Sequence, residues 1–231
     1  MTILTPTHED GATSYPIGMT APDPTRSVTE AHLDRFLADS GMNAPFLAGF
    51  LSMVLTHERC GVHLANSLAA RTQNPVLKAR YRSAAAEGRR HVEVLEGAVA
   101  GLGGDPAYVA PVARAVEGSD DAALEATYRL DGSIDVMTRE AVMLDAFLLA
   151  SFRSHENWST LQDLVAKLPE GGDRDALQEA VGSCEDDKDD QLAWARDMRR
   201  KMIETQASNR TVAAVGLKVE EAVATVKGWF S

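Results

Sequence analysis

Two ionisable side chains interrupt otherwise apolar helical stripes, and they are the first candidates for chemistry in this chain. Glu58 lies in the middle of one stripe, in which apolar residues recur at alternating steps of three and four, and His91 lies in the middle of a second stripe. A carboxylate or an imidazole in a bundle core is costly unless it is paired or ligated. Both side chains are therefore expected to face polar partners or a metal ion.

Two further stripes carry polar residues near their midpoints. The third contains Ser151, and the fourth contains Lys188 and Gln191. Since the midpoints of antiparallel helices meet at one height, we expect a single polar layer at the waist of the bundle. The predicted core polar cluster consists of Glu58, His91, Ser151, Lys188 and Gln191.

Local start and stop signals support the four helices that would position this layer. Asn43 and Asn74 are suitable N-caps for the first two helices, and each is followed by a proline that the first turn tolerates. The predicted helices span residues 44–72, 74–103, 134–168 and 173–208. Short connections make the first two helices antiparallel neighbours, and likewise the last two. The stretch 105–132 is interrupted by prolines and glycines and predicts a long crossover with a short helix at 122–129.

The layout and four segments resemble the ferritin-like superfamily, specifically a bacterial branch of it. The segments are HERCGVHLANSLAART, RRHVEVLEGAVAGLGGDP, SHENW and DQLAWARD. The resemblance covers residues 44–207 and implies an all-α, ferritin-like four-helix bundle, made of two antiparallel hairpins joined by a long crossover. Its di-iron members hold two metals with a Glu from each of two helices and a Glu-x-x-His from each of the other two.

The chain departs from that ligand set at most positions. Glu58 and His91 stand where the family has a Glu and a His. Gly88, Ser151 and Lys188 stand where it has glutamates, and Gln191 stands at the remaining His position. A charged Lys188 has no lone pair and adds positive charge to a site built for cations. We therefore expect an incomplete di-iron centre.

Two functions from different classes follow from these residues. The first is a binding or scaffolding protein in which a Lys188–Glu58 pair stabilises the core, with no catalytic residue. The second is an iron-binding protein or a metal-dependent, ferroxidase-like oxidase that uses the surviving ligands, with iron or another divalent metal as cofactor. The candidate metal ligands are Glu58, His91, His155, Glu87 and Gln191.

The composition of the chain limits the partners it is expected to bind and the cellular compartment in which it is expected. The 231 residues include 23 Lys and Arg against 34 Asp and Glu, a net charge of −11, which argues against nucleic acid and anionic membranes as partners. No apolar run is convincing as a membrane span, and the N-terminus does not resemble a signal peptide. Cys60 and Cys184 form no C-x-x-C motif, so a reduced, cytoplasmic chain is expected.

Three regions are predicted along the chain. Residues 1–26 lack apolar periodicity and are expected to form a flexible arm. Residues 27–207 form the bundle, beginning with a short amphipathic helix at 32–39. Residues 208–231 carry valines at helical spacing and predict an amphipathic tail helix that docks on the bundle or on a protein partner. The family resemblance is also compatible with a homodimer.

Overall fold

The structure is a computed structural model that describes residues 36–37, 40–129 and 135–208. Those residues form six α-helices, and none of them lies in a strand, so the prediction of an all-α fold is confirmed for the described part of the chain. The helices are α1 (Ala44–Arg71), α2 (Pro75–Gly101), α3 (Pro111–Tyr128), α4 (Val136–Val165), α5 (Gly172–Gly182) and α6 (Glu185–Ser208). The predicted arm and almost all of the predicted tail and of the short helix at 32–39 lie outside the described residues.

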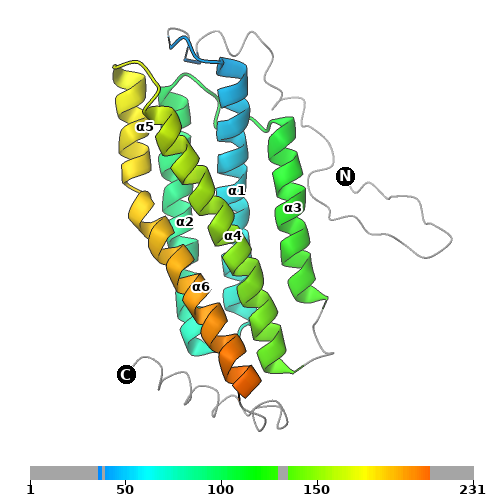
Figure 1. The fold of residues 1–231 in the computed structure, drawn as a ribbon. Coiled ribbons are helices and arrows are strands. Elements are labelled where there is room, and N and C mark those ends of the chain that lie inside the picture. Colours follow the sequence, from blue (N-terminus) through cyan, green and yellow to red (C-terminus); the bar gives the residue numbers. More distant parts are fainter. Residues whose placement is uncertain (1–35, 38–39, 130–134, 209–231) are drawn as a thin grey trace, which may run out of the picture.

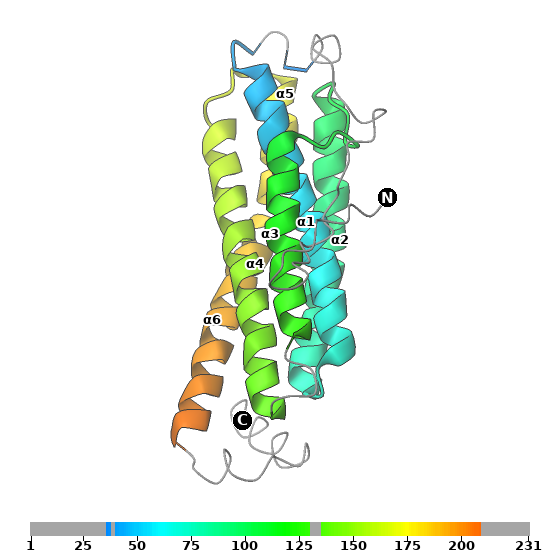
Figure 2. The ribbon, with the colours of Figure 1, turned by 90° about the vertical axis from the view of Figure 1, so that its right-hand side faces the viewer.

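The helices lie side by side in an elongated bundle (Figures 1 and 2). In the view of Figure 1, α1 runs downward, α2 returns upward, α3 runs down beside α1, α4 returns, and α5 and α6 run down in succession. The most extensive packing joins α1 to α2, α1 to α3 and α4 to α6. The antiparallel arrangement of α1 and α2, and of α4 and α5–α6, agrees with the sequence prediction.

The predicted helix starts are confirmed by their capping contacts. The Asn43 side chain accepts a hydrogen bond from the backbone N–H of Phe46 at 3.2 Å, and the Asn74 side chain accepts from those of Val76 and Leu77. These bonds satisfy backbone donors that have no partner within the first helical turn. The Asn74 cap thus fixes the point at which α2 begins after the short turn that follows α1.

The crossover contains more helix than the sequence predicted. Instead of a short helix at 122–129, α3 begins at Pro111 and has 18 residues. Pro111 lies in the first turn, where its missing N–H costs nothing. Gly118 lies inside the helix, and the loss of helix propensity at this glycine is offset by the packing of α3 along α1.

The predicted helix at 173–208 is divided in two. After α5 ends at Gly182, the Ser183 hydroxyl donates to the Ala180 carbonyl at 2.8 Å, and the Cys184 N–H donates to the Val181 carbonyl at 3.0 Å. The Cys184 backbone bond spans three residues instead of four, which tightens the chain at the end of α5. α6 then begins at Glu185.

Two apolar clusters fill the core above and below the polar layer. The first includes Leu55, Leu95 and Leu161, and the second includes Tyr81 and Phe147, whose rings meet edge to face with centroids 5.1 Å apart. Glu58, His91, Ser151 and Lys188 each lie along the chain between a member of one cluster and a member of the other. The polar layer is therefore enclosed by packed side chains on both sides.

Glu140 is a buried carboxylate that the sequence did not single out. It is 2% exposed, and it accepts from the Thr72 hydroxyl at 2.6 Å and from the Gln73 N–H at 2.8 Å, tying α4 to the α1–α2 connection. Glu140→Ala leaves the Thr72 hydroxyl without this acceptor and is expected to lower the free energy of unfolding by about 1–3 kcal/mol in urea denaturation. The exposed control Glu170→Ala should change it by less than about 0.5 kcal/mol. Equal effects would contradict a structural role for Glu140.

Candidate functional site

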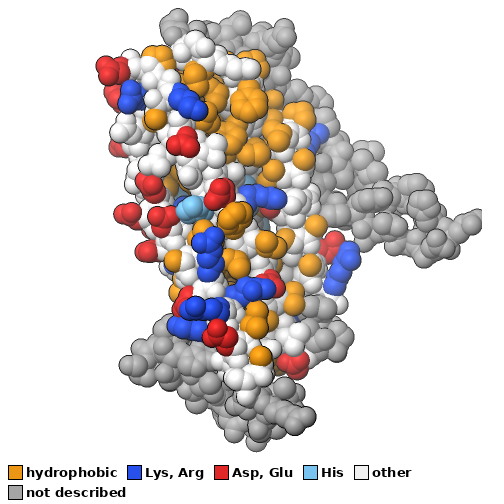
Figure 3. Space-filling model, viewed as in Figure 1, with side chains coloured by type: hydrophobic (Ala, Val, Ile, Leu, Met, Phe, Trp, Pro, Cys, Tyr) orange, Lys and Arg blue, Asp and Glu red, His pale blue; other side chains and the backbone are white. Residues whose placement is uncertain are grey.

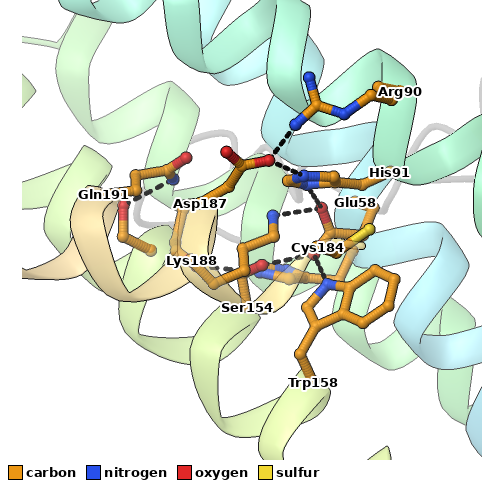
Figure 4. A network of polar contacts seen from close by, with 12 residues as sticks. Glu58, Arg90, His91, Ser154, Trp158, Cys184, Asp187, Lys188 and Gln191 are labelled. Carbon is orange, nitrogen blue, oxygen red and sulfur yellow. Dashed lines mark hydrogen bonds and ion pairs between the residues drawn. The ribbon is translucent and has the colours of Figure 1, made fainter. Parts of the chain in front are cut away.

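Glu58 is the centre of the polar layer and is 3% exposed. Its Oε1 accepts hydrogen bonds from the Ser154 hydroxyl and, at 2.9 Å, from Trp158 Nε1. Its Oε2 accepts from Lys188 Nζ at 2.7 Å, as Figure 4 shows. The carboxylate thus joins α1, α4 and α6, and the predicted pairing of Lys188 with Glu58 is confirmed.

The position of Lys188 follows from where α6 begins. The first turn of this helix carries Glu185, Asp186 and Asp187, whose negative charges favour a helix N-terminus. Lys188 follows directly and is 4% exposed, so its stem and its ammonium both lie in the core. A lysine that is buried to this extent is stable only with a partner, and Glu58 supplies the matching charge.

The electrostatic balance at Glu58 favours its ionised form. Burial raises the pKa of this carboxyl, but the Lys188 ammonium, the nearby His57 and the hydrogen bonds from Lys188 and Ser154 lower it by more. The net result is a pKa lowered to about 2. At neutral pH the pair therefore consists of a carboxylate and an ammonium.

His91 lies beside this pair and is completely buried. Its Nε2 is 2.9 Å from Asp187 Oδ2, which also forms an ion pair with Arg90, and its Nδ1 is 3.9 Å from Glu58 Oε2 (Figure 4). Burial and the Lys188 charge lower the pKa of His91, against the opposing effects of Asp187 and Glu58. The ring is therefore neutral at neutral pH, with its proton on Nε2 toward Asp187, and Nδ1 has no hydrogen-bond partner.

Gln191 and Ser151 complete the layer. The Gln191 side-chain amide donates to the Ser151 hydroxyl at 2.9 Å, and that hydroxyl donates to the Phe147 carbonyl at 2.8 Å. Each side chain has a partner within the protein. All five residues of the predicted core polar cluster are thus present in one layer.

Two of the candidate metal ligands make their contacts elsewhere. Glu87 accepts from Arg80 at 2.9 Å and from Ser83 at 2.7 Å, both on its own helix. His155 is partly exposed, and its Nε2 lies 3.0 Å from Asp189. The structure does not bring Glu87 or His155 into contact with Glu58.

The residues present do not fit a di-iron centre. Within the described part of the chain, no group of three or more His, Cys, Asp or Glu side chains is arranged to hold a metal ion. At Gly88, an added Cβ would lie 2.9 Å from Val62 Cγ2, so a longer side chain needs its neighbours to shift. The Lys188 ammonium lies 2.7 Å from Glu58 and repels a metal cation.

Three contributors to the site carried only weak signals in the sequence. The Trp158 indole N–H donates to Glu58, and the Ser154 hydroxyl donates to the same carboxylate. Asp187, in the acidic first turn of α6, contacts His91. Ser154 and Trp158 follow Ser151 at steps of three and four on the same stripe, and this spacing is the signal that could have identified them.

The fold and this layer define an all-α protein with a buried polar core. Comparison of the chain with protein-family models, curated proteins and solved structures gives no match. None of the described helices is both long enough and apolar enough to cross a membrane.

Proposed function

We propose that the chain is a ferritin-like four-helix bundle with an incomplete di-iron centre, and that it has a binding or scaffolding role. The observation that carries this proposal is the 2.7 Å contact between Lys188 Nζ and Glu58 Oε2, with both side chains at most 4% exposed. The ammonium neutralises the carboxylate that a metal would otherwise neutralise. The core is thereby stable without a metal ion.

The chain's topology supports the ferritin-like part of the proposal. α1 and α2 form one antiparallel pair, α4 with α5 and α6 forms a second, and the connection that contains α3 joins them. Glu58 and His91 lie in the waist, at the heights at which the family has its ligands. The proposal thus rests on the order of the elements together with the position of the polar layer.

The hydrogen bonds of Glu58 argue against an oxidase. Three donors already occupy its two oxygens, from Ser154, Trp158 and Lys188. A metal ion would have to displace the Lys188 ammonium, and an ammonium that loses its partner in a core is strongly destabilising. Metal binding at Glu58 therefore competes with the stability of the bundle.

Iron loading tests this function directly. When the purified protein is mixed with Fe(II) without oxygen and then exposed to air, we expect substoichiometric iron and no fast oxidation phase. Lys188→Glu removes the competing ammonium, adds a carboxylate and should increase iron uptake. Lys167→Glu makes the same charge change at an exposed position and should leave uptake unchanged. Two tightly held irons per chain in the unmodified protein would overturn the proposal.

One observation favours the alternative, an iron-binding or ferroxidase-like protein. His91 Nδ1 has no hydrogen-bond partner and faces the Glu58 carboxylate at 3.9 Å, while Asp187 holds the other ring nitrogen. A carboxylate often orients a metal-ligating histidine in this way. Under the alternative, His91→Ala should reduce iron uptake, whereas under the binding or scaffolding role it should not change the substoichiometric iron content.

A further inference from the structure

A cavity of about 390 Å³ lies between α1, α3 and α4, and neither Glu58 nor Lys188 lines it. Cavities of roughly 300–1,000 Å³ with mostly apolar walls and a few polar groups are typical of small-molecule sites. The apolar part of this wall comes from Leu64 on α1, Ala123 on α3, and Leu149 and Phe152 on α4. The size and composition are those of a ligand site.

The Asn157 side chain lines the cavity and carries an unused hydrogen-bond donor, which is itself buried. The residue is 8% exposed, it lines the cavity, and its side-chain Nδ2 has no hydrogen-bond partner. A buried donor without an acceptor is costly, and most such groups in native proteins have a partner. An oxygen acceptor on a bound molecule would remove that cost.

The charged groups of the cavity are already paired with one another. His57 lies 2.7 Å from Asp120 through Nδ1 and 3.0 Å from the Ala150 carbonyl through Nε2. Arg153 donates to the second Asp120 oxygen at 2.9 Å. Glu156 is more than half exposed at the rim and faces His155. No charged side chain is left to balance a charged ligand.

Cys60, which also lines the cavity, indicates the sign of the local field. Burial raises the pKa of its thiol, and the carboxylates of Asp120, Asp121 and Glu117 raise it further, to about 12. The thiol is therefore protonated and is a poor nucleophile. A negative field of this kind also disfavours an anionic ligand.

The rim offers apolar surface that is still in contact with solvent. Leu149 is 63% exposed and Phe152 is 45% exposed, and both line the cavity. Hydrophobic side chains also lie among charged ones on the face over α4 and toward α3 (Figure 3). A ligand with an apolar body would cover this surface as it enters.

We propose that the cavity between α1, α3 and α4 binds an uncharged small molecule that has an apolar body and one acceptor oxygen, such as a ketone or an amide. On binding, the Asn157 amide turns so that Nδ2 faces the cavity and donates to that oxygen, and the body packs against Leu64, Ala123 and Phe152. The proposal adds a ligand to the binding role and does not depend on the Lys188–Glu58 pair, so either can fail alone.

Three probes of similar size and with unbranched carbon chains separate the head groups. Isothermal titration calorimetry of the full chain with 2-octanone, octanoate and octylamine should give the tightest binding for 2-octanone, by about ten-fold. Absence of 2-octanone binding would overturn the proposal. Equal or tighter binding of octanoate or octylamine would overturn the assignment of an uncharged ligand.

Variants locate the binding in the cavity. Asn157→Asp replaces the donor by an acceptor and should weaken 2-octanone binding by about ten-fold. Ser159→Asp adds the same charge on the exposed face of α4 and should leave it unchanged. Ala123→Phe fills the cavity from α3 and should abolish binding. This variant tests the location of the site if Asn157→Asp does not fold. Unchanged 2-octanone affinity in Ala123→Phe, or in a folded Asn157→Asp, would contradict the assignment.

Discussion

Lys188→Met is expected to lower the free energy of unfolding by about 3–5 kcal/mol, because it leaves the Glu58 carboxylate in the core without its counter-ion. Glu58→Gln should cost a similar amount, since the buried Lys188 ammonium then lacks a carboxylate. The double variant should recover much of the loss, because both charges are gone. In that variant the Ser154 and Trp158 donors remain available to the side-chain carbonyl of the introduced glutamine.

A double-mutant cycle in urea denaturation at neutral pH measures this coupling. The control is the Lys201–Asp197 pair, which has the same 2.7 Å separation but lies on the surface of α6. Solvent screens that pair, so Lys201→Met and Asp197→Asn should show little coupling. A coupling energy between Lys188 and Glu58 that is no larger than in the control would contradict the buried ion pair. The polar layer would then again be a candidate metal site.

Acid is expected to remove the contribution of Glu58 to stability. Its pKa is lowered from 4.5 in an unfolded chain to about 2 in the fold, so the unfolded state binds more protons between these values. The stabilising contribution is therefore complete above pH 4.5 and is lost as the pH falls toward 2. The loss should reach up to roughly 3 kcal/mol over this window.

Comparison of the unmodified protein with Glu58→Gln isolates this effect. Their difference in free energy of unfolding should be large above pH 4.5 and should shrink steadily as the pH falls toward 2. His91 acts in the same direction, because its lowered pKa makes protonation below 6.5 favour unfolding. Because His91 contributes to the pH dependence of both proteins, the effect of Glu58 is taken from the difference between them. A difference that is independent of pH would show that Glu58 does not titrate as its contacts require.

The sequence predicted the long helices well because their signals are local. Asn43 and Asn74 cap α1 and α2 through their own side chains, and these contacts involve residues two and three positions away. The predicted extent of α3 was wrong. The prediction treated Pro111 as a residue that interrupts helix, although this proline lies in the first turn of α3. The break after Gly182 was missed because the helical spacing of the stripe continues across it, from Val181 in α5 through Cys184 to Lys188 and Gln191 in α6.

The polar layer was predictable only in part. Lys188 lies at the same height in the bundle as Glu58 because of helix register, and this register can be read from the sequence. The contact of Asp187 with His91 depends on how closely α2 and α6 approach, and the His57–Asp120 contact depends on where α3 lies against α1. Such distances arise from packing between distant segments, so no local pattern encodes them.

The separation of Glu58 and Lys188 along the chain also bears on the kinetics of folding. The two residues are 130 positions apart, and Trp158 is 100 positions from Glu58. We expect their attraction to contribute mainly once α6 packs against α1 and α4, because a contact between such distant segments closes a long loop. Interactions that form after the transition state slow unfolding without accelerating folding. On this expectation, the buried pair lengthens the lifetime of the native state more than it assists its formation.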